Sequence, residues 1–205
     1  MYSPPYNRND DRAEVLAFLR ANAFPLLVTG TGGALHASHL PVLVREEGEA
    51  LFLDLHMARS NPQWKEFFDE EVLVVFSGPH AYVSPRWYEE KQRVPTWNYA
   101  AVHAYGLPRV VEGHAAVHAS QRRLVECFDP AWLPDFDALD PTYMAGMMDN
   151  ITAFEIRVTR LETRWKLSQN RGRREMELIA AQLDQSADSA ERALAALTRR
   201  HLPDA

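Results

Sequence analysis

The stretch Leu35-His36-Ala37-Ser38-His39-Leu40-Pro41-Val42-Leu43-Val44 decides the fold class of this 205-residue chain. Taken in steps of two residues, it presents one set of side chains to each of two faces. Successive side chains of a β-strand point to opposite faces, so this pattern predicts one strand over residues 35–44. Residues 45–49 include Gly48 and predict a turn, after which residues 51–55 return as a second strand. The stretch therefore predicts an antiparallel hairpin.

The rest of the chain adds further short strands, separated by turns rather than by long helices. They are predicted over residues 26–29, 72–76, 97–105, 153–158 and 164–167. We find no internal repeat and no alternation of parallel strands with helices. This pattern is typical of a mainly β, α+β protein built on an antiparallel barrel with peripheral helices.

Helices are predicted near both ends of the chain and between the later strands. The first follows the capping residues Asp10 and Asp11 and carries Val15, Leu16 and Leu19 on one face. A short helix starts at Asn61-Pro62. The other helices are expected over residues 115–128, 141–148, 173–183 and 190–197. We predict a barrel domain over residues 1–170, followed by a C-terminal helical extension packed on the barrel over residues 171–205.

Composition excludes several classes of protein. With 46% hydrophobic and 24% charged residues, the chain has the balance of an ordinary globular protein. The single Cys127 excludes an internal disulfide framework, and we expect it in the core on its predicted helix. The longest apolar runs are too short to span a bilayer, and the first twenty residues carry no signal-peptide core. We therefore expect a cytoplasmic protein without membrane association.

Charge is unevenly spread over a chain whose formal net charge is −6. Residues 157–174 contain seven basic side chains and one acid, whereas five aspartates between residues 123 and 157 have no basic neighbour in the sequence. A basic segment can bind phosphate or nucleic acid. We favour a solvated strand pair that faces the acidic stretch of the same chain. No helix-turn-helix with a basic recognition helix is evident, and the net charge argues mildly against direct DNA binding, which the sequence leaves undetermined.

Several familiar chemistries lack support in the sequence. The motifs for dinucleotide, triphosphate, zinc protease and α/β-hydrolase sites are all missing. His36 and His39 lie on opposite faces of one predicted strand, so they cannot jointly bind one metal ion. His56 ends the paired strand and could come near His39, but their spacing alone predicts no metal site.

Three segments are denser in polar or aromatic residues than a structural role requires. Residues 55–64 place Arg59 and Ser60 before a capped helix start, which offers a guanidinium, a hydroxyl and free backbone N–H groups for a phosphate. Residues 78–99 predict a rigid loop that exposes aromatic rings. Residues 165–171 place five polar side chains directly after a strand, which suggests a site for a ring edge or a phosphate.

The same segments carry a resemblance to a known family. The matching motifs are His56-Met57-Ala58-Arg59-Ser60-Asn61-Pro62-Gln63-Trp64, Gly78-Pro79-His80-Ala81-Tyr82-Val83-Ser84-Pro85, Val94-Pro95-Thr96-Trp97-Asn98-Tyr99 and Lys166-Leu167-Ser168-Gln169-Asn170-Arg171, with Met1-Tyr2-x-Pro-Pro and His36-Ala37-Ser38-His39-Leu40-Pro41 in support. From residue 1 to about residue 180 the chain resembles the PaiB family of FMN-binding negative transcriptional regulators. The resemblance implies a split β-barrel of the pyridoxamine-phosphate-oxidase type, dimeric, with FMN at the subunit interface.

The resemblance also implies which residues contact the cofactor. Arg59 and Ser60 stand where related flavoproteins bind the phosphate, residues 38–41 run along the flavin edge, and residues 97–99 lie nearby, contributed by the other subunit. The full set of expected FMN-binding residues is Ser38, His39, Leu40, Pro41, His56, Arg59, Ser60, Trp97, Asn98, Tyr99, Lys166, Ser168 and Gln169. The sequence departs from the family at Leu55, where we expect Gly, at Ser60, which replaces a second cation, and over residues 112–128.

Two other functions stay open beside a regulator that binds FMN. One is an FMN-dependent oxidoreductase acting on a small planar substrate, for which no acid–base pair can be named. The other is a heme-binding split barrel, which would take its ligand from His39, His56 or His103.

A homodimer is expected from the aromatic residues as well. Residues 82–99 contain the rings of Tyr82, Trp87, Tyr88, Trp97 and Tyr99, more than one small barrel interior should hold. Rings left outside would form an apolar patch, and two-fold pairing is the commonest way to cover one.

Overall fold

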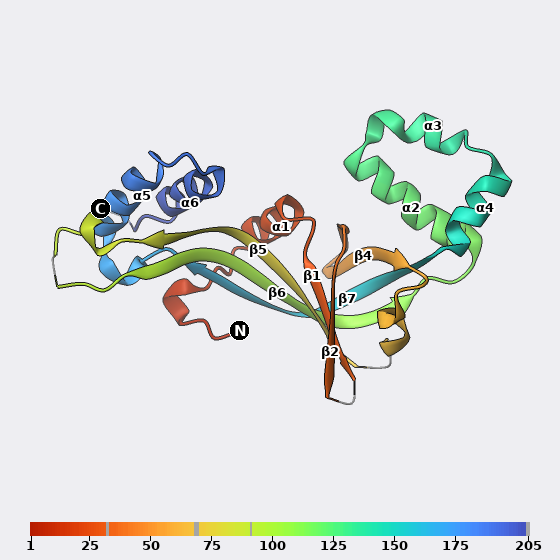
Figure 1. Cartoon of the computed structure of the whole chain (residues 1–205), viewed down its shortest axis with the longest axis horizontal. Helices are drawn as coiled ribbons and strands as arrows, with labels where there is room; N and C mark the ends of the chain where they lie inside the picture. The colour runs from red at the N-terminus through yellow and green to blue at the C-terminus, as the bar shows by residue number, and fades with distance from the viewer. Residues whose placement is uncertain (32, 68–69, 91, 204–205) are drawn as a thin grey trace. The chain divides into compact units, whose positions relative to one another are not determined.

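The computed structural model describes residues 1–31, 33–67, 70–90 and 92–203 (Figure 1). Lys91 of the predicted aromatic loop and residues 204–205 of the predicted extension lie outside the described residues. The strands are β1 Leu26–Thr31, β2 Ala34–His39, β3 Val42–Glu47, β4 Ala50–Ala58, β5 Val72–Val83, β6 Thr96–Val110 and β7 Ile151–Lys166. The α-helices are α1 Arg12–Ala21, α2 His114–Phe128, α3 Leu133–Asp137, α4 Pro141–Asp149, α5 Arg173–Leu183 and α6 Ser189–Arg200, with 3-10 turns η1 Pro5–Asn7, η2 Pro62–Glu66, η3 Pro85–Trp87, η4 Pro130–Trp132 and η5 Gln169–Arg171.

The strands form one sheet in the order β2-β1-β5-β6-β7-β4-β3. The pairs of β1 with β2 and β5, and of β4 with β3 and β7, are antiparallel. The predicted antiparallel α+β class is therefore confirmed.

The chain packs as two compact units made of alternating segments. Unit 1 contains Met1–Phe18, Ser77–Val102 and Glu162–Ala205, and unit 2 contains Leu19–Phe76 and His103–Leu161. The long strands β5, β6 and β7 each contribute residues to both units. The predicted boundary near residue 170 concerns contiguous domains and stays a prediction.

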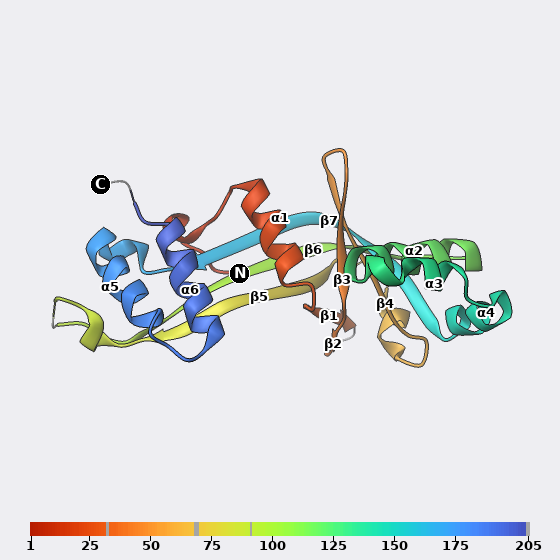
Figure 2. The same ribbon diagram turned by 90° about the horizontal axis from the view of Figure 1, so that it is seen from above.

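Unit 1 is built around helices α5 and α6, which lie side by side in Figures 1 and 2. Their apolar faces are fully buried at Met176, Ile179 and Leu194. Phe18 packs on Trp165 with 4.9 Å between ring centroids. Gly78 is required here, because a Cβ at that position would lie 2.4 Å from the Phe18 ring.

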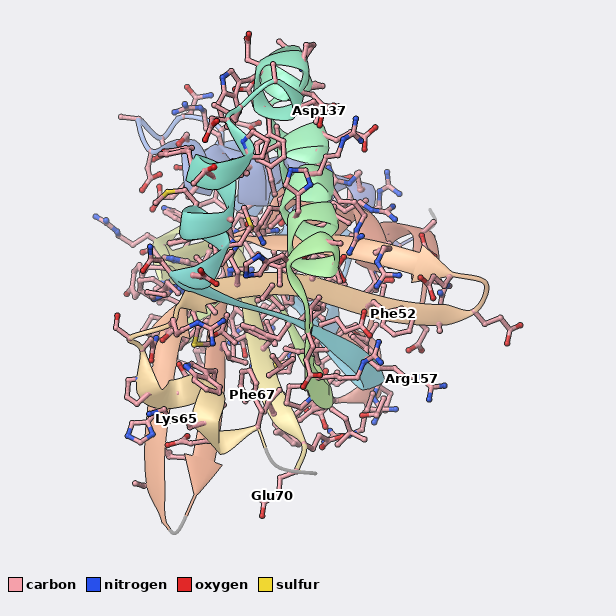
Figure 3. All side chains as sticks on the ribbon, turned by 90° about the vertical axis from the view of Figure 1, so that its right-hand side faces the viewer. Phe52, Lys65, Phe67, Glu70, Asp137 and Arg157 are labelled. Atoms are coloured by element: carbon pink, nitrogen blue, oxygen red, sulfur yellow. The ribbon has the colours of Figure 1, made fainter. Side chains whose placement is uncertain are left out.

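Unit 2 combines the short strands with helices α2, α3 and α4. Its sheet buries Leu27, Leu53 and Phe154 completely. Figure 3 looks onto this region, where Phe52 of β4 pairs in register with Arg157 of β7. A second apolar cluster lies under the helices, where Val117, Phe136, Met144 and Met148 are buried together with Ala153 of β7.

A buried carboxylate links the helices of unit 2 to its sheet. Asp54 on β4 is 1% exposed. Its carboxylate accepts hydrogen bonds from Arg45 of β3 at 3.1 Å and from Arg123 of α2 at 3.0 Å. Arg45 also pairs with Glu155 of β7 at 3.0 Å. Elements far apart in the sequence thus share one ion-pair network, which satisfies the buried charge.

The single strand predicted over residues 35–44 is wrong. The structure has two strands, β2 and β3, separated at Leu40 and Pro41. Proline lacks the N–H that would continue a strand ladder. The neighbouring amides of Leu40 and Val42 instead donate to the carbonyls of Pro25 and Ala23, at 3.2 and 2.9 Å. β2 therefore pairs with β1, while β3 pairs with β4.

The rigid loop predicted from residue 78 is also wrong in its first half. Residues 78–83 continue β5 through Gly78 and Pro79. Pro79 is tolerated because it lies beyond the three register pairs that join β5 to β1. Likewise, the separate strand predicted over residues 164–167 is the end of the continuous strand β7.

The burial of two side chains differs from the prediction. Cys127, expected in the core, is exposed at the end of α2. Tyr88, counted among the surplus rings, is buried at 1% exposure. The predicted helices over residues 115–128, 141–148 and 173–183 match α2, α4 and α5.

The charges also pair differently from our expectation. Arg160, Arg173 and Arg174 pair with Glu71, Glu177 and Glu89 rather than with the aspartates of residues 129–149. Asp137 of that stretch pairs with Arg122 instead, at 2.8 Å.

Of the helices in the described part of the chain, none has the length and apolar character needed to cross a membrane.

Candidate functional site

The motif Asn61-Pro62-Gln63 forms a clamp on the β1–β2 hairpin in unit 2. Gln63 is 2% exposed. Its Nε2 donates to the carbonyls of Leu27 and His36, at 3.3 and 3.2 Å. Its Oε1 accepts a hydrogen bond from the hydroxyl of Ser38 at 2.6 Å, and Nδ2 of Asn61 donates to the same hydroxyl at 3.0 Å. The single donor of Ser38 is therefore used within the protein, and the clamp fixes this strand against η2.

The loop that carries Arg59 and Ser60 is anchored through its own backbone. The amide of Arg59 donates to the carbonyl of Asn150 at 2.8 Å. The amide of Asn61 donates to Ala58, and that of Gln63 to the side chain of Asn61. These three amides have partners, so they are not among the free backbone N–H groups predicted for this segment. Ser60 itself is exposed.

The guanidinium of Arg59 has two protein partners. Its Nε donates to the carbonyl of Asp149 at 2.8 Å, and its Nη2 donates to that of Ile151 at 2.9 Å. Its Nη1 has no hydrogen-bond partner within the described residues, and the residue is exposed to solvent. Arg59 therefore holds the start of β7 while keeping one edge of its charge available to an anion.

The remaining predicted residues of unit 2 differ in their surroundings. His39 is exposed and stacks on Phe24 at 5.7 Å between ring centroids, whereas Leu40 is buried and Pro41 is half-buried. His56 is half-buried on β4, and burial lowers the pKa of its imidazole. Among the described residues no group of three or more metal-binding side chains converges.

A second set of predicted residues meets in unit 1. Asn98 of β6 is fully buried, and its side chain bonds the hydroxyl of Ser168 at 2.9 Å. Ser168 has a positive φ of 69°, a conformation rarely adopted by residues other than glycine. The carboxamide of Gln169 accepts from the amide of Leu167 at 2.8 Å and donates to the carbonyl of Trp165. These bonds fix the tight turn that follows β7.

Lys166 supplies a cation at the end of β7. Its ammonium donates to the hydroxyl of Thr96 and, at 2.9 Å, to the carbonyl of Trp97. Burial lowers the pKa of Lys166, and the nearby charges of Arg164 and Arg171 lower it further. The charged groups that act on Lys166 are both basic. The cluster of Lys166, Arg164 and Arg171 is therefore suited to an anionic ligand. Arg171 lies in the segment 165–171 that was predicted as a polar site, whereas Arg164 was not predicted as a site residue.

Exposed rings lie near this cation cluster. Trp97 is 49% exposed and Tyr82 is 47% exposed. Their rings meet edge to face at 6.2 Å between centroids, and His80 lies 5.8 Å from Trp97. Tyr99 is half-buried and packs under the guanidinium of Arg164 at 5.4 Å. Flat exposed rings beside cations suit a planar ligand with a negative charge.

The structure thus divides the predicted site residues into two groups. Ser38, His39, Leu40, Pro41, His56, Arg59 and Ser60 belong to unit 2, whereas Trp97, Asn98, Tyr99, Lys166, Ser168 and Gln169 belong to unit 1. Gln63, quoted in a motif but given no role, could have been singled out because a polar residue two positions after a capping Asn lies inside the first turn. No comparable signal marked the grouping of Arg164 with Lys166.

Sequence comparison places these motifs in a wider group. A family profile described as "Putative FMN-binding domain" matches residues 1–160. "Protease synthase and sporulation protein PAI 2" of Bacillus subtilis is 35% identical over 185 residues, which cover 89% of each chain. An uncharacterised protein of Emericella nidulans is 26% identical and covers 88% of this chain and 89% of its own.

Structure comparison supports the fold. The flavocytochrome Anf3 of Azotobacter vinelandii has a TM-score of 0.61 at 15% identity, covering 78% of this chain and 69% of its own. An FAD- and heme-binding protein of Mycobacterium smegmatis has a TM-score of 0.60 at 13% identity, covering 78% of this chain and 73% of its own. At such low identity these likenesses show the fold alone, and that fold is the predicted split barrel.

Proposed function

Because the chain belongs to the PaiB family of FMN-binding split-barrel proteins, we propose that it binds FMN and acts as a regulator. The observation that carries the proposal is that Lys166 donates to the carbonyl of the exposed Trp97, while Arg164, one of its two basic neighbours, lies over the ring of Tyr99. FMN is a flat ring system with a phosphate, so it needs both a stacking surface and cations. The residues present fit these needs.

The donors in unit 1 support the fit further. The Nε of Arg164 is buried, and none of the described residues accepts its hydrogen bond. A buried guanidinium N–H without a partner is unfavourable, and a phosphate or ring oxygen would satisfy it. Lys166 and Arg164 would then hold the phosphate or ring edge, while Trp97 packs on the ring. When bound, FMN supplies reversible electron transfer.

The residues of unit 2 enter the proposal through the family resemblance. Arg59 keeps its Nη1 edge available, and Ser60 is exposed next to it. We propose that both contribute to the phosphate site in a homodimer, with Ser38, His39, Leu40 and Pro41 along the flavin edge. Because the hydroxyl of Ser38 donates to Gln63, its proposed role is to position this strand through the clamp.

The regulatory role follows the name of the Bacillus relative and remains part of the proposal, as does the cytoplasmic location. DNA is a weaker candidate partner than FMN. On α6, whose basic residues could have formed a recognition helix, Arg199 is paired with Asp184. The oxidoreductase stays a second candidate, for which we name no acid–base pair.

The test is the absorption spectrum of the purified protein, followed by titration with FMN and with riboflavin, which lacks the phosphate. We expect flavin maxima and a preference for FMN over riboflavin of about tenfold to a hundredfold, the value of a charge-assisted contact. A Soret band would support the heme alternative instead. A colourless protein that binds neither added flavin would contradict the proposal.

A further inference from the structure

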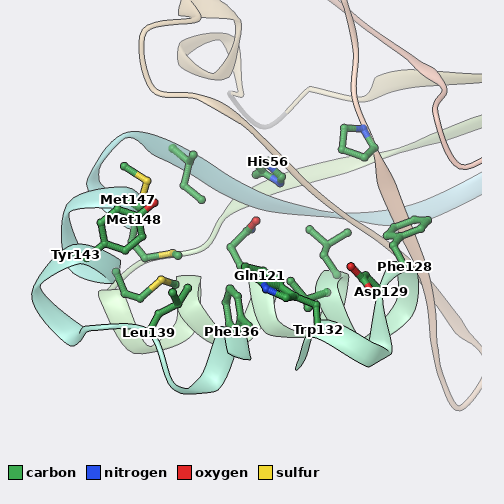
Figure 4. A pocket seen from close by; sticks show the side chains of 15 residues that line it. His56, Gln121, Phe128, Asp129, Trp132, Phe136, Leu139, Tyr143, Met147 and Met148 are labelled. Atoms are coloured by element: carbon green, nitrogen blue, oxygen red, sulfur yellow. The ribbon is translucent and has the colours of Figure 1, made fainter. Parts of the chain in front are cut away.

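A cavity of about 460 Å³ lies in unit 2, lined by α2, α3, α4 and the neighbouring ends of β4 and β7 (Figure 4). Most of its lining is apolar and soft, and includes Leu124, Phe136, Leu139, Met144, Met147 and Met148. The volume falls within the usual range for small-molecule sites. Methionine side chains adapt their shape to flat and irregular ligands.

Two polar side chains interrupt this apolar lining. Figure 4 shows His56 of β4 and Gln121 of α2 among the lining residues. The Nδ1 of His56 and the Nε2 of Gln121 are both buried, and neither has a hydrogen-bond partner in the part of the chain that the structure describes. Buried polar atoms are normally paired, and a few convergent polar groups in an apolar pocket are typical of ligand sites.

Large rings at the same cavity are exposed to solvent. Phe128 is 53% exposed, Trp132 is 42% exposed and Tyr143 is 55% exposed, and all three line it. Trp132 meets Phe136 edge to face at 5.8 Å between centroids. Exposed apolar surface of this extent marks a binding surface more often than a solvated one.

The charges of the lining limit what can bind. It contains the carboxylate of Asp129 but no lysine or arginine among the residues described. Because burial lowers the pKa of His56, its imidazole is neutral near pH 7. A phosphate or carboxylate would have no cation here, which separates this cavity from the cation cluster around Lys166.

We propose that the cavity binds a neutral, planar aromatic molecule whose carbonyl oxygen accepts a hydrogen bond from Gln121. The flat rings and methionines of the lining contact its faces, and His56 completes the polar edge. The cavity adjoins the unit 2 residues of the proposed flavin site, because Pro41 lines it and Arg59 donates to the carbonyl of the lining residue Ile151. We infer a second site beside the flavin rather than the flavin site itself, because no lysine or arginine side chain lines it among the residues described. The occupant is a small molecule rather than a second copy of the chain, because the unpaired atoms of His56 and Gln121 are buried inside a cavity of the volume that a small molecule fills.

The first test uses the methionines as reporters. The chain has six, of which Met144, Met147 and Met148 line the cavity, while Met57 and Met176 are buried elsewhere. The full-length protein, labelled with ¹³C at the methionine methyl groups, is titrated with 6-propionyl-2-(dimethylamino)naphthalene, a neutral planar ketone. We expect saturable shifts of the three cavity signals at one ligand per chain, with Met57 and Met176 unmoved, both with and without saturating FMN.

The second test removes the donor. Gln121→Leu should weaken binding of the ketone about threefold to tenfold, the value of one hydrogen bond. It should leave the affinity for N-phenyl-1-naphthylamine, which has no carbonyl, unchanged. The variant should fold, because it replaces an unpaired buried amide with an apolar side chain of similar size. Gln182→Leu, at an exposed position of α5, is the matched control and should bind both probes like the original protein.

Three results would overturn the inference. The first is the absence of saturable shifts at the three cavity methionines. The second is equal ketone affinity for the original protein and Gln121→Leu. The third is loss of the shifts on adding FMN, or on raising the protein concentration, which would assign the cavity to the flavin or to a second copy.

Discussion

At the scale of single residues, Lys166 is the side chain whose chemistry is most tied to its surroundings. Burial and two arginines lower its pKa, so it loses its proton below the ordinary lysine pKa of 10.5. If its ammonium holds the phosphate, FMN affinity is highest at neutral pH and falls as pH rises through the lowered pKa. Lys166→Arg should abolish this fall, because arginine stays charged throughout.

The control for this titration is riboflavin, which shares the ring and its own proton equilibria but has no phosphate. The affinity for riboflavin should follow the same pH curve in the original protein and in the Lys166→Arg variant. Fluorescence quenching of each flavin between pH 7 and pH 10.5 measures both curves. Identical FMN curves for the two proteins would remove Lys166 from the phosphate site.

Arg59 permits a second prediction at this scale. Arg59→Ala should weaken FMN binding about tenfold to a hundredfold while leaving riboflavin binding unchanged. Because two of its N–H groups donate to carbonyls at the start of β7, the variant should also lose about 1 kcal/mol of unfolding free energy. Arg20→Ala, which removes an exposed arginine paired with Glu46, serves as the control in both measurements. Equal FMN titrations would exclude a phosphate contact by Arg59.

At the scale of elements, Asp54 connects α2 to three strands of unit 2. Asp54→Asn removes the carboxylate that Arg45 and Arg123 share, while Arg45 keeps its pair with Glu155, and we expect a loss of about 1.5–3 kcal/mol in urea unfolding. Asp137→Asn, which breaks an exposed pair with Arg122, should leave the midpoint nearly unchanged. A similar effect of the two variants would mean that the network does not hold α2 in place.

The same scale shows which elements could be predicted. Helices α2 and α5 were predicted closely, because an apolar face that recurs every three or four residues is a local property of the sequence. The break at Pro41 and the continuation of β5 through Gly78 and Pro79 depend on which strand lies alongside. Pairing partners such as Pro25 for Leu40 are distant in sequence, so alternation alone did not reveal them.

The candidate site shows the same division. The motifs pointed to Asn98, Lys166 and Ser168, which meet because the ends of β6 and β7 belong to one unit. The sequence did not reveal that the hydroxyl of Ser38 donates to Gln63, 25 residues away. Whether a polar side chain is available to a ligand depends on such tertiary partners.

At the scale of the whole molecule, the homodimer remains a prediction that the exposed rings support. With Tyr88 buried, the surplus rings reduce to Tyr82 and Trp97, together with the half-buried Trp87 and Tyr99. Sedimentation equilibrium over a concentration series should show a species of twice the 23.4 kDa chain mass. Tyr82→Ser combined with Trp97→Ser should shift the equilibrium toward monomer. The serine substitutions at Tyr6 and Phe24, which are more exposed, should not. A folded monomer at micromolar concentration would contradict the dimer.

The interleaved segments of the two units also limit how such an architecture can evolve. The backbone passes between them four times, after Phe18, Phe76, Val102 and Leu161. Neither unit is one stretch of coding sequence, so neither can be copied, lost or fused as a genetic module. New structure can enter as an insertion within a single segment or as an addition at a chain end. Helices α2, α3 and α4, all between β6 and β7, occupy a place of the first kind. Diversification in this architecture would then proceed by the growth of connections rather than by the shuffling of domains.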